Sequence, residues 1–213
     1  MTLTMQKITF WFFGAIAAIP LPILHRIGNF LGSIGYCFLP KKLRDTISGN
    51  VDSAGIISDK LARHTLIKAV CQESIKGGFE LPVAWMRSSE DIVDLFKAVH
   101  GWEHVQTALE KNEGLLLITP HIGSYDLAGR YISHHLPFPL TAMYRPPKQK
   151  WLDEVMNAGR VRDKGRTAPT NLQGVKQVMK ALRAAEATIV LPDQVPHGAD
   201  GIWVNFFGRP AYT

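Results

Sequence analysis

Charged side chains are nearly absent from the first forty residues. Residues 8–25 carry no formal charge, and a second uncharged run covers residues 27–40. A membrane-spanning helix needs about 20 apolar residues and accepts about 17, so the first run is just long enough. Pro20 and Pro22 are expected to end or kink this helix. Three interpretations compete: a short membrane anchor, an amphipathic or buried core helix, and a signal peptide. The signal peptide is disfavoured because a second apolar stretch and then Lys41, Lys42 and Arg44 follow.

Two later stretches have the spacing of apolar residues expected of helices. One covers residues 59–76 and is expected to stop at the two glycines that follow it. The other covers about residues 89–111 and would place His100 and His104 one turn apart on one face. The pair lacks the second-position glutamate of the metalloprotease motif and a third ligand, so we expect no metal site.

From residue 115 onward, short apolar runs alternate with helical patterns. The apolar runs are typical of strands and cover residues 115–119, 138–144, 187–191 and 202–207. The helical patterns cover about residues 124–135, 148–162 and 171–186. This alternation predicts an α/β fold in which crossover helices flank a sheet.

Length and composition limit the class of protein. With 46% hydrophobic and 20% charged residues, the chain is neither disordered nor a polytopic membrane protein. Its 213 residues suffice for one domain with an appendage. Two cysteines are too few for a disulfide scaffold. We therefore expect an apolar N-terminal segment over residues 1–40 and one domain over residues 41–213.

Positive charge is concentrated in one stretch of the chain. The whole chain has a formal net charge of +6. Residues 141–183 contain ten Lys and Arg against three Asp and Glu, a net of +7, so the remainder is nearly neutral. This stretch is expected to meet an anionic partner. It contains few aromatic residues and no nucleic-acid-binding motif, so we expect no nucleic acid as partner.

The strongest candidate for chemistry follows the predicted strand 115–119. His121 and Asp126 are five positions apart, which on one continuous helix would separate their directions by about 140°. They can meet only if a helix begins between them. Gly123 permits a turn there, and Ser124 is a suitable N-cap.

Such a pair could act as a general-base dyad. A carboxylate bonded to one imidazole nitrogen leaves the other nitrogen free to take a proton from a hydroxyl. The alternative is structural, with His121 capping the helix and Asp126 interacting favourably with its dipole. A hydrolase that uses Ser124 as nucleophile is a further alternative, but no G-x-S-x-G motif supports it.

Residues around this pair resemble the bacterial lipid A biosynthesis acyltransferases, which belong to the wider lysophospholipid acyltransferase superfamily. The resemblance extends from about Leu115 to Thr213 and is weaker before residue 110. Four motifs match in order: His121 to Asp126 as H-x4-D/E, Tyr144-Arg145-Pro146, Gly159-Arg160-Val161-Arg162, and Pro192-Asp193-Gln194 followed by Phe206-Phe207-Gly208.

This resemblance implies a fold and a reaction. The implied fold is a mixed sheet with flanking helices, similar to glycerolipid acyltransferases, preceded by a hydrophobic membrane-anchoring helix. The implied reaction transfers a fatty acyl group from acyl carrier protein to a hydroxyl of a 3-hydroxyacyl chain on a lipid A precursor. It needs no cofactor and no covalent intermediate. The implied location is the bacterial inner membrane, with the catalytic domain on the cytoplasmic face.

The resemblance also implies roles for individual residues. His121 would deprotonate the acceptor hydroxyl and Asp126 would orient His121. Arg145, Arg160, Arg162 and Asp193 would contact the substrates. The three arginines suit phosphates or carboxylates of the acceptor, because guanidinium groups bind such groups in a bidentate manner.

The sequence departs from the family at two points. The motif often has glutamate where this chain has Asp126, a difference of one methylene. The family's chains also continue beyond the position of Thr213, so the domain is expected to be truncated at its C-terminus. Two other functions remain as alternatives: a lysophospholipid acyltransferase, which lacks support because no FPEGTR-like element is present, and a membrane-associated anionic-lipid-binding protein without catalysis.

Overall fold

The chain folds into two compact units. The computed structural model describes all residues except 1–2, 56, 58 and 197–200. One unit is Trp11–Arg87, and the other combines Met1–Phe10 with Ser88–Thr213, so the boundary falls within helix α1 (Leu3–Ala17). The predicted domain boundary at residue 40 was based on charge and not on packing, and it stays a prediction.

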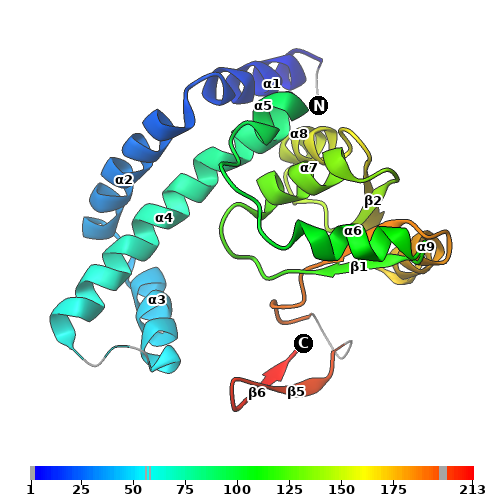
Figure 1. Cartoon of the computed structure of the whole chain (residues 1–213). Helices are drawn as coiled ribbons and strands as arrows, with labels where there is room; N and C mark the ends of the chain where they lie inside the picture. Colours follow the sequence, from blue (N-terminus) through cyan, green and yellow to red (C-terminus); the bar gives the residue numbers. More distant parts are fainter. Residues whose placement is uncertain (1–2, 56, 58, 197–200) are drawn as a thin grey trace. The chain divides into compact units, whose positions relative to one another are not determined.

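Helices make up the unit Trp11–Arg87. They are the part of α1 from Trp11 onward, α2 (Leu21–Cys37), α3 (Lys41–Ala54) and α4 (Lys60–Met86). Figure 1 shows α2 lying along α4. The two backbones approach closely at Gly32, where an added Cβ would lie 2.4 Å from the Cα of Gln72. Glycine is therefore required at this position.

The predicted break at Pro20 is confirmed. Helix α1 ends at Ala17, and α2 begins directly after Pro20, which lacks the N–H that a continuing helix would need. The Arg87 side chain donates to the backbone carbonyl oxygens of Ala17 and Ile19, both at 2.8 Å. These hydrogen bonds satisfy carbonyl groups that would otherwise lack partners at the end of α1.

The predicted end of a helix at Gly77 and Gly78 is wrong. Helix α4 continues through both glycines to Met86, a length of 27 residues. Each glycine in a helix costs about 1 kcal/mol relative to alanine. Val83 and Trp85, which lie beyond the glycines, are 0% and 2% exposed. Burying one such side chain contributes about 1.5–3 kcal/mol, which offsets the glycine cost.

Apolar side chains are exposed on the N-terminal helices. Trp11 on α1 and Phe30 on α2 are among them, and Phe38, which follows α2, is exposed as well. Among the described residues, no single helix has the length and apolarity to cross a membrane. The segments Met5–Ala17 and Leu21–Cys37 meet that criterion only as a pair, and they are bent by 100°. The anchoring role expected for this part of the chain stays a prediction.

A parallel sheet forms the centre of the other unit. Its strands, in order across the sheet, are β1 (Leu115–Ile118), β4 (Ala187–Val190), β2 (Leu140–Tyr144) and β3 (Gly165–Pro169). Parallel strands need crossover connections. The helices in these connections are α7 (Tyr125–His135), α8 (Lys150–Arg160) and α9 (Leu172–Arg183). The α/β class and the flanking helices are confirmed.

Two details of the predicted sheet are wrong. The main sheet is parallel and not mixed. The predicted strand at 202–207 is β5 (Trp203–Phe206), but it pairs antiparallel with β6 (Arg209–Tyr212) in a separate sheet. The core of the main sheet is formed by Leu136, Leu140, Ala187 and Ile189. This packing holds β1 and β4 in place, and the loops that follow these two strands carry the candidate site.

The predicted helix 89–111 is two helices. They are α5 (Ser89–Val93) and α6 (Trp102–Glu110). Gly101 caps α6 with a φ of 78°, a backbone conformation that favours glycine. His100 precedes this cap, so it does not share a helix face with His104. Within the described residues no group of three or more metal-ligating side chains is found.

Candidate active site

The loops that follow β1 and β4 lie side by side at one edge of the sheet. The two strands are parallel neighbours, so their carboxyl ends meet there. A hydrogen bond from Thr119 N–H to the Val190 carbonyl oxygen, at 3.1 Å, continues the pairing beyond β1. His121 follows β1 and Asp193 follows β4. This edge is where open α/β sheets place their functional sites.

His121 is held by Asp193 through two hydrogen bonds. Its Nδ1 lies 2.6 Å from Asp193 Oδ1, and its backbone N–H donates to Oδ2 at 2.7 Å. The side-chain bond from His121 is the main cause that holds the pKa of Asp193 below its ordinary value. An ionised carboxylate beside Nδ1 favours the tautomer with its hydrogen on that nitrogen. Nε2 is then free to accept a proton.

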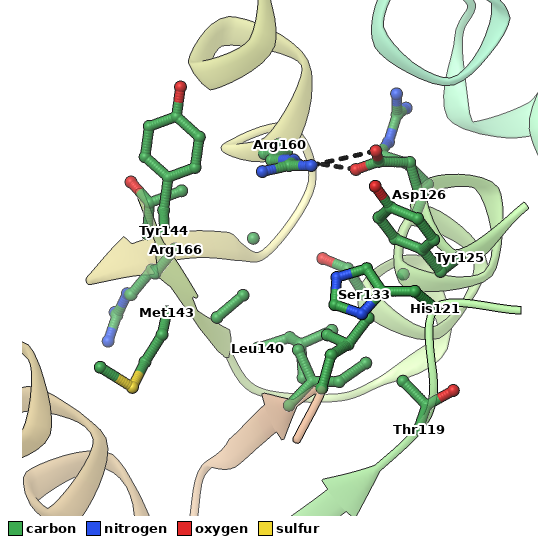
Figure 2. A pocket seen from close by; sticks show the side chains of 17 residues that line it. Thr119, His121, Tyr125, Asp126, Ser133, Leu140, Met143, Tyr144, Arg160 and Arg166 are labelled. Atoms are coloured by element: carbon green, nitrogen blue, oxygen red, sulfur yellow. Dashed lines mark hydrogen bonds and ion pairs between the residues drawn. The ribbon is translucent and has the colours of Figure 1, made fainter. Parts of the chain in front are cut away.

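Asp126 is bonded to Arg160, and the hydrogen bond expected between Asp126 and His121 is not found between these described residues. Arg160 donates to both carboxylate oxygens, at 2.8 and 3.0 Å (Figure 2). The Asp126 side chain is 8% exposed. Burial alone would lower the pKa of Arg160, but the hydrogen bond with Asp126 raises it above its ordinary value. The predicted pair is thus replaced by two pairs, His121–Asp193 and Asp126–Arg160.

The helix start between His121 and Asp126 is confirmed. Helix α7 begins at Tyr125, so Asp126 lies in its first turn. Gly123 has a φ of 60°, which allows the turn before the helix. Ser124 occupies the N-cap position, but its side chain makes no capping hydrogen bond in the described structure. The Tyr125 ring packs edge-on against the His121 imidazole, with 4.9 Å between centroids.

A cavity of about 150 Å³ opens beside His121. Figure 2 shows His121, Tyr125 and the Asp126–Arg160 pair around it. Apart from these residues its lining is largely small or apolar and comes from α7 and the strands: Thr119, Gly129, Ser133, Leu140, Ala142, Met143, Tyr144, Gly165, Thr167, Ile189 and Leu191, together with Arg130 and Arg166. The arrangement combines a histidine able to accept a proton with space for an apolar group.

Comparison with known proteins decides the family. The sequence model described as bacterial lipid A biosynthesis acyltransferase matches residues 3–213. The chain belongs to this family. It is 27% identical over 178 residues to a lipid A biosynthesis palmitoleoyltransferase of Escherichia coli K12, covering 83% of this chain and 56% of that protein. It is 29% identical over 108 residues to a lipid A biosynthesis acyltransferase of Haemophilus influenzae, covering 51% of this chain and 33% of that protein.

The curated relatives are longer than this chain. An acyltransferase of lipid A biosynthesis from Shigella flexneri is also 27% identical over 178 residues, and the match covers 56% of that protein. The chain therefore spans between about a third and just over half of the relatives it matches. The family match favours the lipid A group over the lysophospholipid acyltransferases considered from the sequence.

Arg145 and Arg162, two further predicted site residues, do not line this cavity in the described part of the chain. Arg145 follows β2 and is exposed, and Arg162 is half-buried in the connection between α8 and β3. Tyr144, which precedes Arg145, donates a hydrogen bond to Asp153 at 2.5 Å. Burial, followed by this bond, raises the pKa of Tyr144. The substrate-binding roles of Arg145, Arg160, Arg162 and Asp193 stay predictions.

One buried charged cluster was not predicted from the sequence. Arg130 on α7 is 4% exposed and donates to Asp163 at 3.1 Å. Asp163 also accepts a hydrogen bond from Ser89 and lies 3.7 Å from Nδ1 of His134. Burial would raise the pKa of Asp163, but the hydrogen bonds from Ser89 and Arg130 hold it below its ordinary value. No sequence motif marks this cluster, because its members come from three separate segments.

Replacing Asp163 by asparagine is expected to destabilise the chain. Removing one partner of a buried ion pair costs about 3–5 kcal/mol, and asparagine removes the carboxylate charge that faces the buried guanidinium group of Arg130. Because the folded-state pKa of Asp163 is lowered, its contribution is present above the ordinary aspartate pKa and is lost as pH falls through the lower value. Urea denaturation of the wild type and of Asp163→Asn, at several pH values between neutral and acidic, measures this difference in the free energy of unfolding.

Asp52→Asn is the matched control for Asp163→Asn. Asp52 pairs with Arg63 at 2.6 Å, but its side chain is 55% exposed. Exposed ion pairs contribute little to stability, so this variant should unfold like the wild type. Equal unfolding of Asp163→Asn and the wild type at neutral pH would contradict the role given to the buried cluster.

Proposed function

We propose that this chain transfers a fatty acyl group from a thioester to a hydroxyl group during lipid A biosynthesis. The observation that supports this most directly is His121, whose Nδ1 is bonded to Asp193 while its ring borders an apolar-lined cavity. A base of this kind suits removal of a proton from a hydroxyl. Membership of the lipid A biosynthesis acyltransferase family supports the same reaction class.

The proposed mechanism is direct transfer. Nε2 of His121 takes the proton of the acceptor hydroxyl as its oxygen attacks the thioester carbonyl carbon. The new carbon–oxygen bond forms and the carbon–sulfur bond breaks. The departing thiolate then receives the proton from His121, so the enzyme returns to its starting state. Asp193 stabilises the imidazolium that exists between these steps.

The Asp126–Arg160 pair has a different proposed role. Arg160 lines the cavity, and its positive charge is kept there by two hydrogen bonds to Asp126. Its guanidinium also lies 5.3 Å from the centroid of the Tyr144 ring. Held in this way, the cation is suited to stabilise negative charge on a substrate. In this proposal Asp126 positions Arg160, and Asp193, not Asp126, orients His121.

The proposed donor is acyl carrier protein and the proposed acceptor is a lipid A precursor with a 3-hydroxyacyl chain. Arg145 and Arg162 belong to the basic stretch 141–183, which suits the phosphates of such an acceptor or an acidic donor protein. We place the reaction at the cytoplasmic face of the bacterial inner membrane. Exposed aromatic side chains on α1 and α2 support membrane association, as do Lys41, Lys42 and Arg44 at the start of α3.

The direct test is a turnover assay. The purified chain is incubated with acyl carrier protein thioesters and a lipid A precursor, and the acylated product is measured by mass spectrometry. We expect acyl transfer that depends on the acceptor. A precursor that lacks the hydroxyl on its acyl chain is the matched control and should give no product.

Two outcomes would contradict the proposal. Release of free fatty acid at the same rate with and without acceptor would indicate a hydrolase. Binding of precursor with no product from any thioester would indicate a lipid-binding protein without catalysis. Parallel assays with coenzyme A thioesters show whether the carrier protein itself is needed.

A further inference from the structure

The wall of the cavity formed by α7 has an open space at one position. Tyr125, Gly129 and Ser133 line the cavity and are spaced one turn apart along the helix. A Cβ added at Gly129 would have no atom of the described residues within 4 Å, apart from its chain neighbours and the nearby backbone of its own helix. The cavity therefore extends to the helix backbone at this turn. A larger side chain here would project into empty space.

The opposite wall is apolar. Leu140 and Ala142 come from β2, and Ile189 from β4. Four charged side chains line the cavity, and each has an ion-pair partner: Asp126 pairs with Arg160, Arg130 with Asp163, and Arg166 with Glu186. Paired charges leave little demand for water, so the interior suits a hydrocarbon chain.

The size of the cavity limits what it can hold. It measures about 150 Å³. Apolar protein cavities of about this volume bind benzene, a molecule of six carbon atoms. The cavity is therefore large enough for a hydrocarbon segment of about that size, with the reacting end of the group outside it and near His121.

We infer that this cavity binds the inner part of the fatty acyl chain and that Gly129 determines how long a chain the enzyme accepts. This inference rests on the proposed acyl transfer. A leucine at Gly129 would fill most of the space beside α7 and leave His121, which comes from the loop after β1, unchanged. It would also favour the helix more than glycine does.

The test compares donor lengths in Gly129→Leu and the wild type. Rates are measured with thioesters of octanoate, decanoate, dodecanoate, tetradecanoate and hexadecanoate. We expect kcat/KM for the longest donor to fall at least ~10-fold relative to the shortest, since even one methylene in an apolar pocket changes kcat/KM by about 10- to 200-fold. Gly78→Leu is the matched control, because Gly78 also lies in a helix with nothing within 4 Å. Its donor preference should equal that of the wild type.

A second variant and a binding assay test the same cavity independently of Gly129→Leu. Ala142→Leu narrows the same cavity from β2 and should shift preference in the same direction if Gly129→Leu fails to fold. Displacement of a fluorescent fatty acid by free fatty acids of the same lengths reports chain binding without turnover. An unchanged length preference in the variants, by rate and by displacement, would overturn the inference even with normal wild-type transfer. If the wild type transfers no acyl group but displacement still depends on chain length, only the proposed function is contradicted.

Discussion

Replacing His121 by glutamine is expected to lower kcat for acyl transfer by about 10²- to 10⁴-fold. Glutamine keeps a polar side chain at the edge of the cavity but cannot accept the proton of the acceptor hydroxyl. The His121 side chain is 27% exposed, so its loss should not affect folding. KM for donor and acceptor should change little, because the rest of the cavity lining stays in place.

The measurement is steady-state transfer with both substrates varied, together with a thermal melt of each protein. His104→Gln is the matched control, since His104 is exposed on α6 and does not line the cavity. A His121→Gln variant that is folded and retains wild-type kcat would exclude His121 as the general base.

Sequence patterns predicted the framework of this site well, for physical reasons. The strands 115–119 and 187–191 are compact apolar runs, and a strand buried in a parallel sheet needs such runs. The start of α7 between His121 and Asp126 follows from local turn chemistry at Gly123. Both features depend on residues that are neighbours in sequence, so both can be deduced without the fold.

The pairing within the site could not be deduced in this way. His121 and Asp193 are separated by 72 positions, and they meet only because β4 lies next to β1 in the sheet. The sequence suggests Asp126 as the partner of His121 because it is nearby in the chain. It does not reveal the order of the strands in the sheet, which brings Asp193 to His121. Strand β3 was missed because its residues, Gly165–Pro169, lack an apolar run. The continuation of α4 through its glycines likewise depends on tertiary burial, which overrides local propensity.

Asp193→Asn is expected to lower kcat by about 10²- to 10⁴-fold, close to the effect of losing His121 itself. Both carboxylate oxygens of Asp193 accept hydrogen bonds from His121, one from the ring and one from the backbone. An asparagine has one acceptor oxygen, so its NH₂ group must face one of these donors. The tautomer and orientation of the imidazole are then lost, while the residues that line the cavity are unchanged.

Comparison with Asp126→Asn distinguishes the two carboxylates. Asp126 lines the cavity and holds Arg160, so its loss should raise KM more than it lowers kcat. Asp193 does not line the cavity in the described structure, so its loss should lower kcat with KM nearly constant. A kcat loss that is large in Asp126→Asn and small in Asp193→Asn would contradict this assignment. It would instead support the dyad that the sequence motif suggested, and it would require the Asp126 carboxylate to leave Arg160 when substrate binds.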